Sequence, residues 1–181
     1  EETSDGPQPL LPIDSPGSEL QVHKAAFFFR LERELEKINA FYLQKESELR
    51  TRLTTLITKK RHLIALANRP VGHNVITRDT PSLVTLLEGF RYFEKDLSKL
   101  QQFIEINATG FRKILKKWDK RFKSQTKELY LARQVEVQPC FNREFMTEMS
   151  DIASASILQL ESLADGHELP STPFKNEVAL L

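Results

Sequence analysis

Apolar residues recur at intervals of three and four along most of this chain, which is the spacing of an amphipathic α-helix. Between residues 19 and 67 they form one long seam made of Phe28, Leu31, Leu35, Ile38, Tyr42, Leu49 and Leu56. The seam predicts a helix from about Glu19 to about Ala67. Pro70 and Gly72 then end the pattern and predict a loop that runs to Thr80.

A second apolar seam follows this loop and keeps a strict alternation of three and four. Its members are Leu83, Leu86, Phe90, Phe93, Leu97, Leu100 and Ile104. Thr80 and Pro81 supply an N-cap and a proline at the first helical position, which predicts a helix over about residues 81–106. Two such seams joined by a loop are expected to pack as a long antiparallel hairpin. The residues expected between them are Phe28, Leu35, Ile38, Phe90, Phe93 and Leu97.

The remainder of the chain predicts shorter helices. Residues 107–110 interrupt the apolar pattern, so a kink or a helix restart is expected there, with Thr109 as a cap. A third helix is expected from Phe111 to about Leu131, Pro139 breaks the chain, and a last amphipathic helix is expected over about 142–163. The sequence therefore predicts an all-α domain, with a long antiparallel hairpin or three-helix-bundle-like core and shorter C-terminal helices.

The composition sets the limits of this domain. Residues 1–18 are rich in proline and small polar residues and are expected to form a disordered linker, and residues 166–181 a flexible tail. The folded domain is therefore expected over 19–165. No stretch approaches the ~20 apolar residues of a membrane span. Cys140 is the single cysteine, so a reducing compartment, cytoplasmic or nuclear, is expected.

Positive charge is concentrated in one segment. Residues 112–127 hold eight Lys or Arg and one Asp, a net charge of +7, whereas the whole chain carries +1 and the rest therefore −6. On a helical wheel one face of this segment is apolar and consists of Phe111, Ile114, Leu115, Trp118 and Phe122. The opposite face consists of Lys113, Lys116, Lys117, Lys120, Lys123 and Lys127.

Such a lysine face has several interpretations. It could be the solvated side of a structural coiled-coil interaction module, or it could bind a small polyphosphate, nucleic acid or an anionic membrane surface. Nucleic-acid readers favour Arg and base-stacking aromatics on the binding face. Here the cations are Lys and the aromatics lie on the other face, which favours a phosphate cluster bound by point charges. The predicted ligand-binding residues are Lys113, Lys116, Lys117 and Lys120, with Lys123 and Lys127 as an extension.

The sequence gives little support for catalysis. The histidines are scattered and form no metal-binding pair, Cys140 has no evident base, and no glycine-rich phosphate loop is present. No catalytic residue, metal or cofactor is therefore expected.

Two stretches resemble the SPX domain family. The first is Asn107-x-Thr109-Gly110-Phe111-x-Lys113-Ile114-x-Lys116-Lys117-x-Asp119-Lys120, which resembles the family signature. The second runs from Phe27 to Tyr42 and resembles the family's long central helix. Within the family, the sequence most resembles a fungal subtype in which the SPX domain precedes ankyrin repeats and the protein inhibits a cyclin-dependent kinase.

The resemblance implies a phosphate-sensing helical bundle that binds inositol polyphosphates or pyrophosphates. It implies that Lys113, Lys116 and Lys120 belong to a surface lysine cluster and that Lys117 helps to grip one phosphate. It also implies a further Tyr and Lys on an N-terminal helical hairpin, which this chain is expected to lack. The implied partner is a cyclin–CDK complex, and no nucleic acid is expected to bind.

Overall fold

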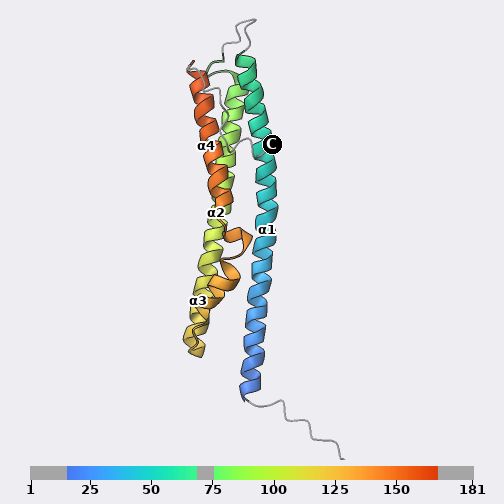
Figure 1. Cartoon of the computed structure of the whole chain (residues 1–181), viewed down its shortest axis with the longest axis vertical. Coiled ribbons are helices and arrows are strands. Elements are labelled where there is room, and N and C mark those ends of the chain that lie inside the picture. Colours follow the sequence, from blue (N-terminus) through green and yellow to red (C-terminus); the bar gives the residue numbers. More distant parts are fainter. Residues whose placement is uncertain (1–15, 69–75, 167–181) are drawn as a thin grey trace, which may run out of the picture. The chain divides into compact units, whose positions relative to one another are not determined.

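A computed structural model describes residues 16–68 and 76–166 of the chain. Its long helices are α1 (Pro16–Ala67), α2 (Pro81–Phe122) and α4 (Glu144–Ala164). Between α2 and α4 lie the short helix α3 (Thr126–Tyr130), the π-helical turn η1 (Leu131–Val135) and the 3-10 turn η2 (Pro139–Phe141), as Figure 1 shows. The described residues contain no strand, and the all-α prediction is confirmed.

The chain divides into two compact units, Glu1–Lys37 and Ile38–Leu181, and α1 runs through both. The described part of the first unit is the N-terminal portion of α1. This helix begins at Pro16, three residues before the predicted start. Leu35 is buried as expected, but Phe28 is only half-buried, and its ring meets that of Phe27 edge to face at 5.1 Å.

In the second unit, α1 and α2 run antiparallel, as the two seams predict. Phe41 of α1 stacks against Phe103, with ring centroids 4.6 Å apart. About three turns further along α1, Arg52 pairs with Asp96, and one turn later Leu56 packs beside Gly89. Residue numbers rise on α1 while they fall on α2, which fixes the antiparallel direction.

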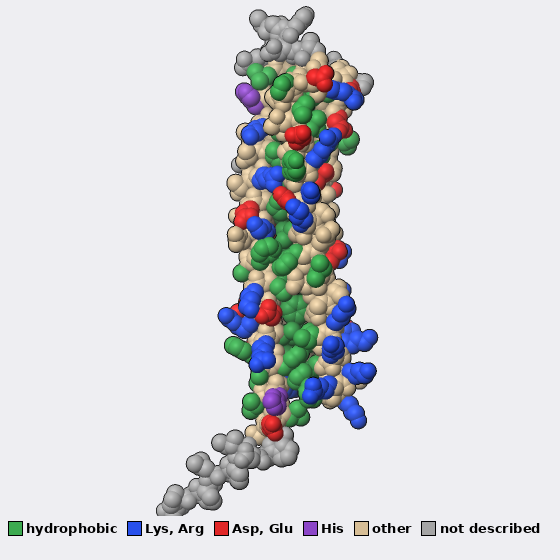
Figure 2. Space-filling view, turned by 180° about the vertical axis from the view of Figure 1, so that it is seen from behind, with side chains coloured by type: hydrophobic (Ala, Val, Ile, Leu, Met, Phe, Trp, Pro, Cys, Tyr) green, Lys and Arg blue, Asp and Glu red, His purple; other side chains and the backbone are tan. Residues whose placement is uncertain are grey.

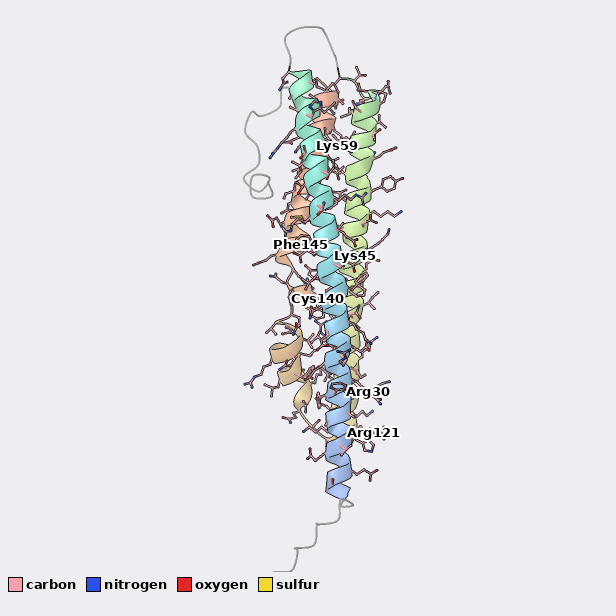
Figure 3. All side chains as sticks on the ribbon, turned by 90° about the vertical axis from the view of Figure 1, so that its right-hand side faces the viewer. Arg30, Lys45, Lys59, Arg121, Cys140 and Phe145 are labelled. Carbon is pink, nitrogen blue, oxygen red and sulfur yellow. The ribbon has the colours of Figure 1, made fainter. Side chains whose placement is uncertain are left out.

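Helix α4 is the third member of this bundle and runs parallel to α1. Asn39 of α1 accepts a hydrogen bond from the backbone N–H of Cys140 at 3.3 Å, before α4 begins. Further along α4, Lys60 of α1 donates to Ser156 (3.0 Å) and to Gln159 (2.9 Å). Figure 3 shows Cys140 and Phe145 along α1 in the order that this parallel direction requires.

The core follows the predicted seams closely. In the second unit the buried residues of the two seams are Ile38, Tyr42, Leu49, Leu56, Leu83, Leu86, Phe90, Phe93, Leu97 and Leu100, while Ile104 is half-buried. On α4, Phe145, Met149, Ile152 and Leu160 are buried and Ile157 and Leu163 are half-buried, as the predicted amphipathic helix requires. Burial of these apolar surfaces is the main stabilising term of the bundle.

The predicted interruption at residues 107–110 is wrong, because α2 continues through it without a break. Gly110 costs a helix about 1 kcal/mol relative to alanine, which is less than the burial of one large apolar side chain. Phe111 is buried directly after it. Asn107 turns its side-chain amide back to the carbonyl of Phe103 at 2.7 Å, so it does not compete with the helical backbone bonds.

Two predicted helix ends also differ. Thr80 is the N-cap residue of α2, but its hydroxyl accepts a hydrogen bond from the backbone N–H of Thr77 (2.9 Å) and none from the helix. The predicted helix from Phe111 to Leu131 is wrong in extent, because α2 ends at Phe122 and the chain turns before α3. Lys123 adopts the left-handed conformation at this turn, with φ of 50°.

Candidate functional site

The C-terminal part of α2 presents lysines to solvent. Lys113, Lys116, Lys117 and Lys120 are all exposed and lie on one side of the helix, and these four residues are called the lysine surface below. Figure 2 shows Lys and Arg side chains gathered over this end of α2, with no acidic side chain among them in that view. The arrangement creates a local excess of positive charge.

The lysine surface differs from other cations of the chain in its lack of ion pairs with carboxylates. Within the described residues, no carboxylate lies within ion-pair distance of any lysine of the lysine surface. In the N-terminal half of α2, by contrast, Asp96 pairs with both Arg52 and Lys99, at 2.8 and 2.9 Å. Arg91 pairs with Glu161 at 3.3 Å. A solvated face normally mixes signs in this way, so the lysine surface is an unneutralised patch.

The apolar face of the same segment is narrower than predicted. Phe111, Leu115 and Trp118 are buried, as the wheel predicts. Ile114 and Phe122, which share the apolar face of the wheel, are exposed, so the expected burial of Phe122 is wrong. Phe122 is the last residue of α2, and its ring stacks against Trp118 with the ring centroids 4.1 Å apart. Three buried side chains therefore anchor this part of α2 and direct the lysines outward.

Asp119, the only acid of residues 112–127, closes the turn after α2. Its carboxylate accepts hydrogen bonds from Ser124 Oγ (2.6 Å) and from the backbone N–H groups of Thr126 and Lys127 (both 3.0 Å). Its backbone carbonyl accepts the N–H groups of Lys123 and Ser124. The carboxylate thus caps the first turn of α3, which explains why the predicted helix ends early.

The pKa of the Asp119 carboxyl reflects this role. Partial desolvation raises the pKa, but the hydrogen bonds from Ser124 and from the Lys127 and Thr126 backbone outweigh it and hold the pKa below its ordinary value. The carboxylate is therefore ionised at neutral pH and is occupied by the turn. No described lysine side chain forms an ion pair with it, so it leaves the lysine surface unneutralised.

The two residues of the predicted extension differ from each other. Lys123 is exposed and directly follows the last turn of α2. Lys127 lies in α3, and its ammonium group pairs with Glu128 at 2.7 Å. Its side chain is only 28% exposed. Lys123 thus resembles the lysine surface in its environment, whereas Lys127 is partly buried and neutralised.

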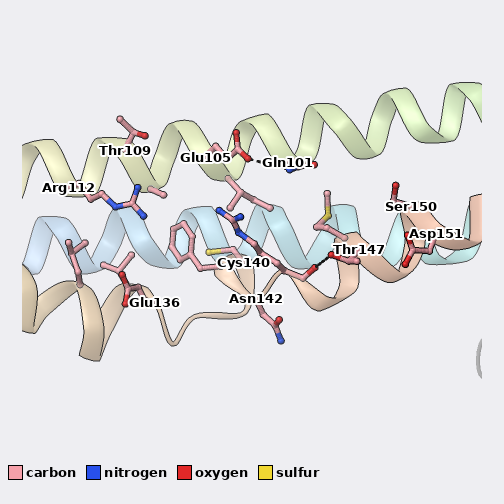
Figure 4. A pocket seen from close by; sticks show the side chains of 17 residues that line it. Gln101, Glu105, Thr109, Arg112, Glu136, Cys140, Asn142, Thr147, Ser150 and Asp151 are labelled. Atoms are coloured by element: carbon pink, nitrogen blue, oxygen red, sulfur yellow. Dashed lines mark hydrogen bonds between the residues drawn. The ribbon is translucent and has the colours of Figure 1, made fainter. Parts of the chain in front are cut away.

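A groove of about 670 Å³ lies between α2 and the segment from η1 to the start of α4. Figure 4 shows its lining, in which Arg112 and Glu136 face each other across the opening. The groove also contains Glu105, Arg143 and Asp151, so its charges are mixed. Three carboxylates make it a poor site for a polyphosphate, which favours the lysine surface as the anion site.

Other chemistries find little support in this geometry. Burial raises the pKa of the Cys140 thiol to about 11, so the thiol is protonated and a poor nucleophile at neutral pH. Among residues 16–68 and 76–166 there is no group of three His, Cys, Asp or Glu side chains placed to hold a metal. No helix in these same ranges combines the length and apolar character needed to cross a bilayer.

Comparison with protein-family models identifies the family of the chain. The model of the SPX domain matches residues 4–80 and 85–133. The chain belongs to the SPX domain family. The resemblance seen in the signature stretch is therefore confirmed. The match begins within residues 1–18, which were expected to be a linker, and the described helix α1 begins there too.

The relatives of this SPX domain include fungal regulators. The chain is 53% identical over 86% of its length to the ankyrin repeat protein nuc-2 of Neurospora crassa. It is 41% identical over 80% of its length to the phosphate system positive regulatory protein PHO81 of Saccharomyces cerevisiae. It spans only 14% and 12% of these two proteins, respectively. No solved structure gives a significant match.

Plant and animal proteins extend the family. An SPX domain-containing membrane protein of Arabidopsis thaliana is 41% identical over 51% of the chain and is matched over 12% of its own length. As a member of the SPX domain family the chain is not an enzyme, as its sequence predicts.

Two features of the site were missed by sequence reasoning. Asp119 was counted only as one charge, although Ser124 and Thr126 follow at distances suited to a side-chain cap. The mixed-charge groove gave no signal, because α2, η1 and α4 bring together residues as distant as Gln101 and Asp151.

Proposed function

We propose that this SPX domain senses phosphate status by binding inositol polyphosphates or pyrophosphates on its lysine surface. The observation that carries the proposal is the set of four exposed lysines on one side of α2 that lack acidic partners within the described chain. Four like charges repel each other, and a compact ligand with several phosphates relieves that repulsion. Inorganic phosphate is too small to contact several of these ammonium groups at once.

The chemistry of the surface favours this ligand class over nucleic acid. The aromatic rings of Phe111 and Trp118 are buried, so they cannot stack on bases. The lysine surface itself consists of lysines, and arginine, the residue that reads guanine most often, occurs beside it only as Arg112 and Arg121 in this segment. Lysine supplies movable point charges, which suit phosphates distributed around a small ring. The alternatives are a purely structural role for α2 or a contact with an anionic membrane.

We further propose that ligand occupancy is relayed to a protein partner, a cyclin–CDK complex. The support is the identity shared with PHO81 and nuc-2, the first of which is described as a regulator of the phosphate system. Since the chain spans a small part of both proteins, this relay belongs to a longer polypeptide. The proposed place of action is the cytoplasm or nucleus.

Isothermal calorimetry with three ligands tests the binding proposal. At ~0.15 M salt, where exposed charges separated by more than ~8 Å are screened, the chain should prefer inositol hexakisphosphate to inorganic phosphate and to a DNA duplex. Equal affinity for the DNA duplex would favour a general polyanion binder. Absence of saturable binding to inositol hexakisphosphate at low as well as physiological salt would favour the structural alternative.

A further inference from the structure

Asp119 occupies an unexpected place for an anion-binding surface. It lies on α2 between Lys117 and Lys120, where its negative charge should weaken the attraction for a polyphosphate. Yet its carboxylate is turned to the chain that follows α2, where it accepts three hydrogen bonds at 2.6–3.0 Å. A carboxylate with three donors is held in one orientation, and within the described residues it forms no ion pair with a lysine, although its charge is retained.

The same residue controls the backbone that carries the next two lysines. Its carbonyl accepts the N–H groups of Lys123 and Ser124, and its carboxylate accepts those of Thr126 and Lys127. Lys123 has a φ of 50°, a conformation that a residue with a side chain adopts only when its surroundings enforce it. The backbone carbonyl of Asp119 accepts the N–H of Lys123 itself, and its side chain holds the residues that follow, Ser124, Thr126 and Lys127.

We propose that Asp119 is a positioning residue that strengthens polyphosphate binding, because it orders the turn after α2 and so fixes Lys123 directly after the lysine surface. This role rests on the proposed function of that surface. It predicts an effect opposite in sign to simple electrostatics. Removal of a negative charge among lysines should favour an anion, whereas loss of the ordered turn should disfavour it.

Charge-matched variants separate the two effects. Asp119→Asn removes one negative charge and replaces one of the two acceptor oxygens of the cap by an NH2 group. Glu128→Gln removes one negative charge from an exposed side chain that pairs with Lys127. Both variants have the same net charge. Ser124→Ala deletes one donor to the Asp119 carboxylate without any change of charge. Circular dichroism confirms that each variant is folded before binding is measured.

The probe is inositol hexakisphosphate, titrated into the full chain by calorimetry over a series of salt concentrations. We expect Asp119→Asn to weaken binding about threefold or more, and Ser124→Ala to weaken it less, as loss of one or two screened charge contacts implies. We expect Glu128→Gln to bind equally well or about twofold tighter. The slope of log affinity against log salt should also decrease in Asp119→Asn, because fewer cations then contact the ligand.

A purely structural role for the turn would leave that slope unchanged. Tighter binding by Asp119→Asn, or binding equal to that of Glu128→Gln, would overturn the positioning role while the binding function stands. Lack of saturable binding by the unaltered chain would instead overturn the proposed function, and the positioning role with it.

Discussion

Reversal of charge on the lysine surface should abolish polyphosphate binding without unfolding the domain. The variant carries Lys113→Glu, Lys116→Glu and Lys120→Glu. All three side chains are exposed, while the anchoring residues Phe111 and Leu115 on the opposite face are untouched. The substitutions therefore change the electrostatics of α2 and leave its packing intact.

The effect on stability follows from neighbours three and four positions apart on α2. Two repulsive pairs stay repulsive and one attraction becomes a repulsion, while three repulsive pairs become attractive. The last three are Arg112 with residue 116, residue 113 with Lys117, and Lys117 with residue 120. At about 0.2–0.5 kcal/mol per pair, the net gain is roughly 1 kcal/mol. A glutamate in the last turn of α2 opposes the helix dipole by about 0.3–1 kcal/mol. The free energy of unfolding should thus stay within about 1 kcal/mol of its original value.

The effect on binding is much larger. Each reversal replaces an attraction by a repulsion, at about 0.5 kcal/mol for each term with exposed groups. Three reversals amount to about 3 kcal/mol, or roughly a 100-fold loss of affinity. Calorimetry with inositol hexakisphosphate measures the loss, and thermal unfolding followed by circular dichroism measures the stability.

The control variant has the same net charge but alters other exposed cations, by Lys59→Glu, Lys95→Glu and Arg133→Glu. Both triple variants change the formal net charge from +1 to −5, since each reversal subtracts two. The control should retain most of the binding. Equal losses in both variants would mean that net charge, and not the lysine surface, attracts the ligand. Unfolding of the first variant would mean that these lysines are structural.

Two further predictions concern stability. Gly110→Ala should raise the free energy of unfolding by about 0.5–1 kcal/mol, because alanine favours a helix and its Cβ meets no atom within 4 Å. Gly89→Ala should give no such gain, because its Cβ would lie 2.9 Å from Leu56 Cδ2, and urea unfolding of both variants measures the difference. The hydrogen bond from Lys99 chiefly, together with that from Arg52, outweighs desolvation and lowers the pKa of Asp96 below 3.8, so its stabilisation is present above that pH and is lost as the pH falls through the lowered pKa. Asp96→Asn should therefore lower the free energy of unfolding more at pH 7 than at pH 2, and an equal deficit at both would contradict the argument.

The long helices could be predicted because the spacing of apolar residues in each seam indicates which side of the helix is buried. Leu83, Phe90 and Phe93 are fully buried, as their spacing requires. Local signals misled at Asn107–Gly110, since tertiary burial on both sides outweighs the small cost of a glycine within a helix. Lys60 shows a second limit. A lysine is expected at the surface. Here Ser156 and Gln159 of α4, almost one hundred residues later in the sequence, supply acceptors for its ammonium group, and the side chain is only 1% exposed.

The lysine face could be predicted from periodicity and charge alone, whereas its organisation could not. The wheel places Lys113, Lys116, Lys117 and Lys120 correctly on the exposed side of α2, but it carries no information on where α2 ends and therefore misplaces Lys127. That end is set by Asp119, which acts through Ser124, Thr126 and Lys127 beyond the helix. The exposure of Phe122 follows from the same cause, because the residue lies at the terminus of α2 rather than in its middle.

The central claim, that a polyphosphate binds on the lysine surface, is tested most directly by nuclear magnetic resonance of the chain labelled with ¹⁵N at lysine. Inositol hexakisphosphate is added at low salt, about 50 mM, where exposed charges are less screened. The account predicts that the largest shifts and a saturable response occur at Lys113, Lys116, Lys117 and Lys120, while Lys59 stays unchanged. Shifts of similar size at all lysines, or shifts at Lys59 that exceed those on α2, would contradict it.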